Sequence, residues 1–141
     1  MSRLLMLLST GIALLLGVIH LAYTFSGSRL LPRDPSLLDA MQRAPLSLTA
    51  ETTVWRAWVG FNASHGLGLV LFALVFAYLA MAQPQVLFAS NFLLAVGFAM
   101  LLCLLVLARV YWFSIPTAGM AACVLCFAAS IAAARFWPHG G

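Results

Sequence analysis

Residues 86–110 read VLFASNFLLAVGFAMLLCLLVLARV, and Arg109 is the only charged side chain in this stretch. A helix that rises 1.5 Å per residue needs about 20 apolar residues to cross the hydrocarbon core of a bilayer. Backbone polar groups inside that core must hydrogen-bond within the protein, and a single segment achieves this only as a helix. The stretch is therefore predicted to be a transmembrane helix.

Three further runs have the same character, over residues 4–25, 54–81 and 116–136. The first follows Arg3, as a signal peptide would, but it is longer than a typical signal-peptide core and contains His20 and Tyr23. We therefore expect it to be retained. The predicted fold class is all-α, a four-transmembrane-helix bundle forming a single integral membrane domain over residues 1–141. Short connections predict that the last three helices are antiparallel neighbours.

The composition of the whole chain supports a membrane location. Of its 141 residues 65% are hydrophobic and only 7% are charged, whereas soluble domains have about 45–50% and about 25%. Mean hydropathy is +1.08. Seven arginines against three acids give a net charge of +4, but the arginines are scattered, which argues against nucleic acid as a partner. The expected partner is the lipid bilayer.

One long loop, residues 26–53, separates the first two predicted helices. Asp34 and Pro35, followed by Leu37, Leu38 and Met41, predict a capped short helix with one apolar side. The loop is therefore expected to be partly ordered. Its helix either lies along the membrane surface or over the bundle, or is simply part of the connection between two helices.

The arginines also predict an orientation. Five of them lie on the side of the long loop and two on the opposite side: Arg29, Arg33, Arg43, Arg56 and Arg109 against Arg3 and Arg135. The positive-inside rule then places both termini outside and the long loop in the cytoplasm. Tyr111, Trp112 and Trp137 are expected at headgroup depth, where aromatic side chains are enriched.

The second predicted helix carries the most informative polar residues. Trp55, Trp58, Asn62 and His65 follow one another at steps of three and four, which places them on one stripe that continues through apolar residues. Gly60, Ser64 and Gly68 form a neighbouring stripe of small residues that predicts close approach of another helix. We therefore expect Asn62 and His65 to point into the bundle, where polar side chains are costly and indicate function.

Partners for this stripe are expected on the first helix. His20, Tyr23 and Thr24 lie within about one turn of each other near the long loop, and Arg109 is expected to approach from the third helix. Counting residues from the helix ends places the two imidazoles about 9 Å apart along the membrane normal. The candidate ligand-binding residues are His20, Tyr23, Trp55, Trp58, Asn62, His65 and Arg109.

Three interpretations of this cluster are open. The first is a pocket for a lipid- or quinone-like molecule, whose polar head is held by His, Asn and Tyr side chains and whose body lies against aromatic rings. The second is a redox subunit with haem or quinone at His20 and His65, although the 9 Å offset argues against haem. The third is a purely structural set of interhelical hydrogen bonds, worth about 0.6–2 kcal/mol each.

No residue is assigned a catalytic role, and the balance favours a protein that is not an enzyme. The predicted spans contain no Asp or Glu, which argues against a carboxylate proton relay. Two histidines without cysteine or carboxylate neighbours fall short of a metal site. Cys123 and Cys126 form a CxxC pair, yet cysteines in apolar helices usually behave as small hydrophobes. Oligomeric state is open, whether with copies of the chain or with other proteins.

Several short motifs together resemble one family. They are Gly17-x-x-His20-Leu21, Thr24-Phe25, Pro32-Arg33-Asp34, Glu51-Thr52-Thr53-x-Trp55, Gly60-Phe61-Asn62-x-Ser64-His65-x-Leu67-Gly68 and Ala108-Arg109-x-Tyr111-Trp112-Phe113-Ser114-x-Pro116. The chain resembles a family of small bacterial integral membrane proteins with four predicted helices and no assigned activity. The resemblance covers nearly the whole chain and is densest over residues 51–68. It implies a bacterial inner-membrane location and that His20, Asn62, His65, Arg109 and the Tyr111-Trp112 turn belong together, but no substrate and no cofactor.

Overall fold

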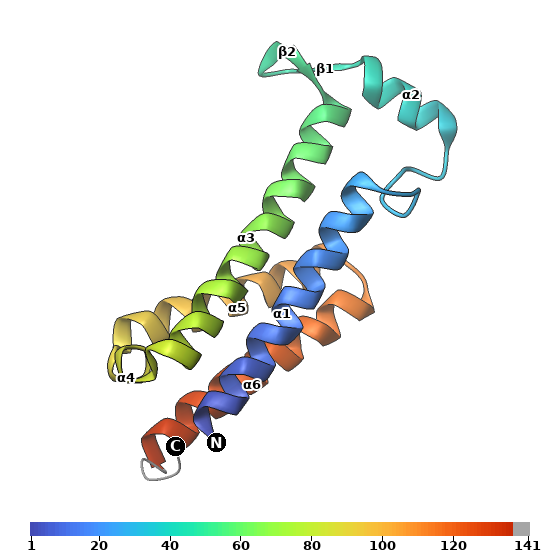
Figure 1. Ribbon diagram of the computed structural model, residues 1–141. Coiled ribbons are helices and arrows are strands. Elements are labelled where there is room, and N and C mark those ends of the chain that lie inside the picture. Colours follow the sequence, from blue (N-terminus) through green and yellow to red (C-terminus); the bar gives the residue numbers. More distant parts are fainter. Residues whose placement is uncertain (137–141) are drawn as a thin grey trace. The chain divides into compact units, whose positions relative to one another are not determined.

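A computed structural model describes residues 1–136 and shows an almost entirely helical chain (Figure 1). Its elements, in chain order, are α1 (Ser2–Phe25), α2 (Pro35–Arg43), β1 (Pro45–Leu46), β2 (Thr49–Thr53), α3 (Val54–Ala82), α4 (Pro84–Ala89), α5 (Asn91–Tyr111) and α6 (Ser114–Phe136). Among the described residues, four helices (α1, α3, α5 and α6) are long and apolar enough to cross a membrane. The all-α fold class with four such helices is confirmed, and it fits a multi-pass integral membrane protein.

The helix boundaries agree with the sequence prediction to within a few residues, except at the start of α5. Gln83 alone separates α3 from the six-residue helix α4, which begins at Pro84, and α5 starts only at Asn91. The Ser90 side chain accepts a hydrogen bond from the backbone N–H of Leu93 at 3.2 Å and so caps α5. Trp137, expected at headgroup depth, lies outside the described residues.

The long loop contains the predicted capped helix. Asp34 is the N-cap of α2, and its carboxylate accepts hydrogen bonds from the backbone N–H and the hydroxyl of Ser36 at 2.9 and 2.8 Å. These bonds hold the pKa of Asp34 below its ordinary value. A short antiparallel hairpin, β1 with β2, follows α2 and was not predicted. It leads directly into α3 at Val54.

The chain divides into two compact units. The first contains residues 1–16 and the described residues from 69 onward, and the second contains residues 17–68. The prediction of a single membrane domain over residues 1–141 stays a prediction. Each unit has its own internal packing, and the two differ in what they bury.

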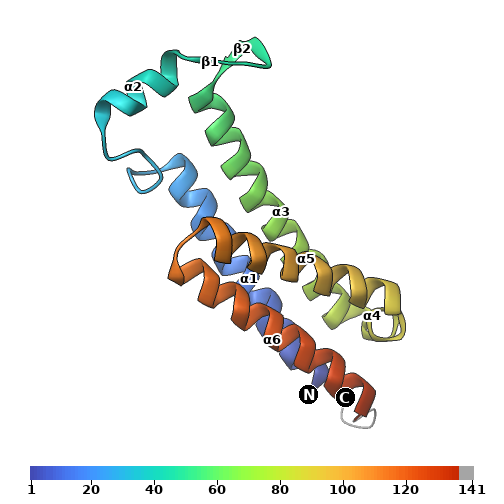
Figure 2. The same ribbon diagram turned by 180° about the vertical axis from the view of Figure 1, so that it is seen from behind.

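The first unit holds the hydrophobic core. Phe127 of α6 is fully buried and lies against Phe76 of α3, with ring centroids 5.6 Å apart. Gly97 of α5 lets these rings approach its backbone, since a Cβ there would meet Phe76 Cζ at 2.5 Å and Phe127 Cζ at 2.7 Å. α5 and α6 run side by side and antiparallel (Figure 2). Antiparallel neighbours are as expected for this pair.

Hydroxyl side chains join the first and last helices within the same unit. Ser9 Oγ of α1 donates to the carbonyl of Cys123 at 2.8 Å, and Ser130 Oγ of α6 donates to the carbonyl of Ser2 at 2.9 Å. Ser9 and Ser130 are fully buried. Serine hydroxyls therefore satisfy carbonyls across two helices where water is absent.

Candidate functional site

The second unit, residues 17–68, contains all the candidate site residues except Arg109. It consists of the end of α1, the long loop with α2 and the hairpin, and the beginning of α3. Arg109 is exposed near the end of α5 and belongs to the first unit. The structure therefore brings six of the seven candidates into one unit.

α1 and α3 approach each other within this unit at Gly66. A Cβ added to Gly66 would lie 2.8 Å from Leu21 Cγ and 3.3 Å from the carbonyl oxygen of Gly17. The expected contact at Gly60, Ser64 and Gly68 is wrong, because among the described residues nothing lies within 4 Å of a Cβ built at Gly60 or Gly68. The small residue that matters is one turn after Asn62, on the same side of α3.

Asn62 is buried beside this contact, with 6% of its surface exposed. Its Nδ2 donates to the carbonyl of Trp58, one turn earlier, at 2.8 Å. Its side chain also interacts with His20 of α1. The prediction that Asn62 points into the protein is confirmed, and the amide connects both helices of the unit.

The imidazoles of His20 and His65 are much closer than expected. Their ring centroids are 5.0 Å apart, and the ring planes are inclined by 59°. The predicted separation of about 9 Å is wrong because the beginning of α3 extends past the end of α1. The chain after Phe25 then continues beside Trp55 and Trp58, as the lining of the pocket described below shows.

His65 itself is exposed, whereas His20 is half-buried. The prediction that His65 points into the bundle holds only in part, because its ring lies 5.0 Å from that of His20 on α1 while the residue stays exposed. These three side chains therefore form a row in which Asn62 is buried, His20 is half-buried and His65 is exposed at the surface of the unit.

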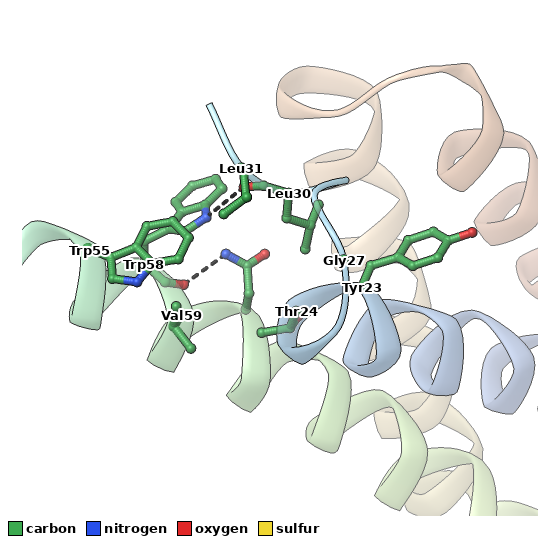
Figure 3. Close-up of a pocket in the computed structure, with 9 residues that line it drawn as sticks. Tyr23, Thr24, Gly27, Leu30, Leu31, Trp55, Trp58 and Val59 are labelled. Carbon is green, nitrogen blue, oxygen red and sulfur yellow. Dashed lines mark hydrogen bonds between the residues drawn. The ribbon is translucent and has the colours of Figure 1, made fainter. Parts of the chain in front are cut away.

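A pocket lies between the ends of the two helices and the first part of the loop (Figure 3). Four candidate residues line it, together with five that the sequence analysis did not select: Tyr23, Trp55, Trp58 and Asn62, with Thr24, Gly27, Leu30, Leu31 and Val59. Its void measures about 230 Å³ with its open mouth included. None of the nine lining side chains is charged.

The loop over this pocket is held by a side chain of α3. Trp58 Nε1 donates to the carbonyl of Leu30 at 3.3 Å, and Figure 3 shows this bond beside the pocket. The loop can turn over the end of α1 because Gly27 adopts a φ of +87°, which side chains other than glycine rarely tolerate. Leu30 and Leu31 are thereby placed against the two tryptophans.

Tyr23 is engaged by an arginine of the same loop. Arg29 donates to the Tyr23 hydroxyl at 2.6 Å, and its guanidinium carbon lies 4.6 Å from the centre of the ring. Thr24, the next residue, donates its hydroxyl hydrogen to the carbonyl of His20 at 2.8 Å. Its oxygen lone pairs are available to a donor in the pocket.

The polar groups that face the pocket are thus neutral. In residues 1–136 no group of three or more His, Cys, Asp or Glu side chains is placed to hold a metal ion. All three cysteines, Cys103, Cys123 and Cys126, are free, and Cys123 is buried. What the pocket can do chemically is hydrogen-bond a small neutral head group and cover it with indole rings.

The histidine pair does not have the spacing of a haem-ligating pair. Two imidazoles on opposite faces of one haem iron would have ring centres about 6 Å apart, given metal–nitrogen bonds of about 2 Å. The observed 5.0 Å is shorter, so a porphyrin could enter only if the helices moved apart. The geometry favours a ligand beside the histidines over one between them.

These features fit a class, a multi-pass integral membrane protein, and they include a small pocket at one end of two helices that are long and apolar enough to cross a bilayer. Compared with models of protein families, with curated proteins and with solved structures, the chain matches none. The assignment of function therefore depends on the site itself.

Proposed function

We propose that this protein binds the polar end of an amphipathic, lipid-like molecule in the pocket formed by α1, α3 and the loop between them. The observation that carries the proposal is the buried Asn62 amide, 6% exposed, at the base of a pocket walled by Trp55, Trp58 and leucines. A few placed polar groups within an apolar, aromatic lining are typical of small-molecule sites.

The size of the pocket selects the kind of ligand. Pockets that enclose drug-sized molecules measure about 300–1,000 Å³, whereas the enclosed part of this pocket measures about 10 Å³, which is room for a water-sized group. A compact ligand of drug size would not fit inside. An amphipathic molecule needs enclosed room only for one carbonyl or hydroxyl of its head, since the rest can lie in the open mouth and along lipid-exposed helix surfaces.

The lining also selects the head group. Because no charged side chain faces the pocket, an ion would lose its hydration without a counter-charge. A neutral carbonyl or hydroxyl, such as that of a quinone or an acylglycerol, can instead exchange hydrogen bonds with Asn62 and Thr24. Flat ring heads gain further from stacking on indole.

A redox version of the same proposal uses a quinone at this position. The observation that favours it is the arrangement of Asn62, His20 and His65, in which neighbouring groups interact and the last is exposed. Neither imidazole lines the pocket; in this version the two histidines hold protons next to Asn62, which does line it. The role of the pocket is the same in both versions.

The test uses a short-chain benzoquinone as probe and the fluorescence of the native tryptophans as readout. Titration of the detergent-purified protein is expected to give saturable quenching, because Trp55 and Trp58 line the pocket. Asn62→Leu should weaken binding by roughly tenfold, the effect of losing a hydrogen bond worth about 1–1.5 kcal/mol. Quenching that does not saturate, or that is unchanged in Asn62→Leu, would contradict the proposal.

Two matched variants separate binding from folding. Ser64→Ala removes an exposed hydroxyl of the same helix that donates to the carbonyl of Phe61, and it should bind the probe like the native protein. His65→Leu changes an exposed side chain and should leave the unfolding free energy nearly unchanged. If His65→Leu mainly destabilises the protein, the histidines serve interhelical packing and the structural interpretation is favoured.

A further inference from the structure

Helix α2 has an apolar side that the rest of the described chain does not bury. Leu37, Leu38 and Met41 share one side of the nine-residue helix, while Asp39 and Gln42 lie on the other. None of its residues is buried; Leu38 and Met41 are half-buried and Leu37 is 51% exposed. An apolar side of this kind on an ordered, capped helix is typical of amphipathic helices that lie at a membrane surface.

The position of α2 in the chain indicates what that neighbour is. The segment between Phe25 and Val54 connects two consecutive helices that can each cross a membrane. Its two ends therefore emerge at the same face of the bilayer, and α2 is tethered at both ends to that face. The tip of the hairpin adds a second apolar side chain, since Leu48 is 91% exposed.

The charges of the segment point to neutral lipid. Residues 26–53 contain three arginines and three acids, Arg29, Arg33 and Arg43 with Asp34, Asp39 and Glu51, which cancel. Arg43 forms an ion pair with Asp39 one turn earlier, and Arg29 is engaged by Tyr23. An attraction to anionic headgroups of the kind given by polybasic segments is not expected here.

We propose that α2 lies in the boundary between headgroups and acyl chains of the bilayer, with Leu37, Leu38 and Met41 toward the lipid. Amphipathic helices bind this boundary by their apolar face, and binding strength grows with the apolar area covered. The contact holds the loop in the plane of the membrane beside the pocket entrance at Leu30 and Leu31. It does not depend on which molecule occupies the pocket.

The experiment measures depth residue by residue. In a variant whose three cysteines are replaced by alanine, single cysteines introduced by Leu37→Cys, Met41→Cys, Asp39→Cys and Gln42→Cys carry an environment-sensitive nitrobenzoxadiazole dye. The protein is placed in phosphatidylcholine nanodiscs, with or without phosphatidylcholine that bears a nitroxide quencher near the headgroup. We expect labels at 37 and 41 to be quenched at least threefold more strongly by the nitroxide than labels at 39 and 42.

Two outcomes would overturn the proposal. Equal quenching at all four positions would mean that α2 does not lie flat in the boundary, and blue-shifted but unquenched labels at 37 and 41 would mean that protein, from this chain or a second copy, covers them.

Replacing a quarter of the lipid by phosphatidylserine should leave the pattern unchanged. A pattern that appears only with phosphatidylserine would also contradict an apolar contact.

Two further variants, Leu37→Asp and Gln42→Asp, test the orientation of α2 without moving the label. Leu37→Asp should reduce nitroxide quenching of the label at position 41, because a charge on the apolar side lifts the helix out of the boundary. Gln42→Asp, on the polar side of the same helix, should leave it unchanged. Equal responses to the two substitutions would contradict the assigned orientation of α2.

Discussion

The two units of this protein bury different kinds of residue. In the first unit large apolar side chains such as Met6, Leu101 and Phe127 are fully buried. Among residues 17–68, all of which the structure describes, only Gly17, Asn62 and Gly66 are buried. The first unit is thus held together by packed large side chains. The second unit is held together by close backbone approach at two glycines and by one buried amide.

This difference indicates that the first unit provides most of the stability and the second unit the binding site. Burying Phe or Leu side chains gains dispersion contacts with every neighbour, whereas a glycine contact gains little beyond close backbone approach. Regions with few buried apolar contacts open most readily. A pocket whose mouth must yield to admit a ligand is therefore expected in the second unit, which is where the structure has one.

The largest effect is expected from Phe127→Ala in the first unit. The ring is fully buried and lies within 6.4 Å, between centroids, of Phe72, Phe76 and Phe98. Its removal should lower the free energy of unfolding by about 3–5 kcal/mol, measured by denaturation in mixed micelles. Phe92→Ala, at a ring that is 75% exposed, is the control, and an equal loss there would refute the contrast.

A smaller effect is expected from Gly66→Val in the second unit. The new side chain would collide with Leu21, which can move, and with the backbone carbonyl of Gly17, which cannot. Overpacking of this kind costs about 1–3 kcal/mol, and it should also weaken quinone quenching because α1 and α3 both line the pocket. Gly60→Val points into open space and should change neither measurement.

The smallest effect is expected at the cap of α2. The pKa of Asp34 is lowered by its bonds to Ser36, so the cap stabilises α2 above the ordinary carboxyl pKa and is lost as pH falls through the lowered value. Asp34→Ala should lower the hydrogen-exchange protection factors of the α2 amides at neutral pH, and the loss of protection that acidification causes in the native protein should be absent from this variant. Asp39→Ala is the control; slower or unchanged exchange in Asp34→Ala would contradict the capping role.

The spans could be predicted from the sequence because a long apolar run has one stable form in lipid. Asp34 and Pro35 likewise allowed α2 to be predicted, since capping is a local interaction. The hairpin could not be predicted, because β1 has two residues and Thr49–Thr53 lacks an apolar alternation. Short α4 was missed for a similar reason, as its six residues continue the apolar character of α5.

The site could be predicted in part. Asn62 was placed correctly, because a polar residue on an otherwise apolar stripe has few alternatives to burial. His65 was placed only in part, since its ring faces His20 of α1 but the residue is exposed. Periodicity fixes a side of the helix only to within about one residue, and Gly66 rather than Gly60 or Gly68 contacts α1. The offset of about 9 Å between the imidazoles was estimated by counting residues from the helix ends. That count assumed that the end of α1 and the beginning of α3 lie at the same depth. Thr24 and Gly27 adjoin Tyr23 in the sequence, and only the loop path shows that they line the pocket.

The hydroxyl bonds between α1 and α6 have a consequence for synthesis. Ser9 and Cys123 are 114 residues apart, and Ser130 and Ser2 are 128 apart. At about 5–20 residues per second, the ribosome delivers the acceptor of Ser9 roughly ten seconds after α1 has reached the membrane. During that interval the hydroxyl of Ser9 has not yet met its final acceptor, so α1 and α6 can be joined by these bonds only after nearly the whole chain has been made.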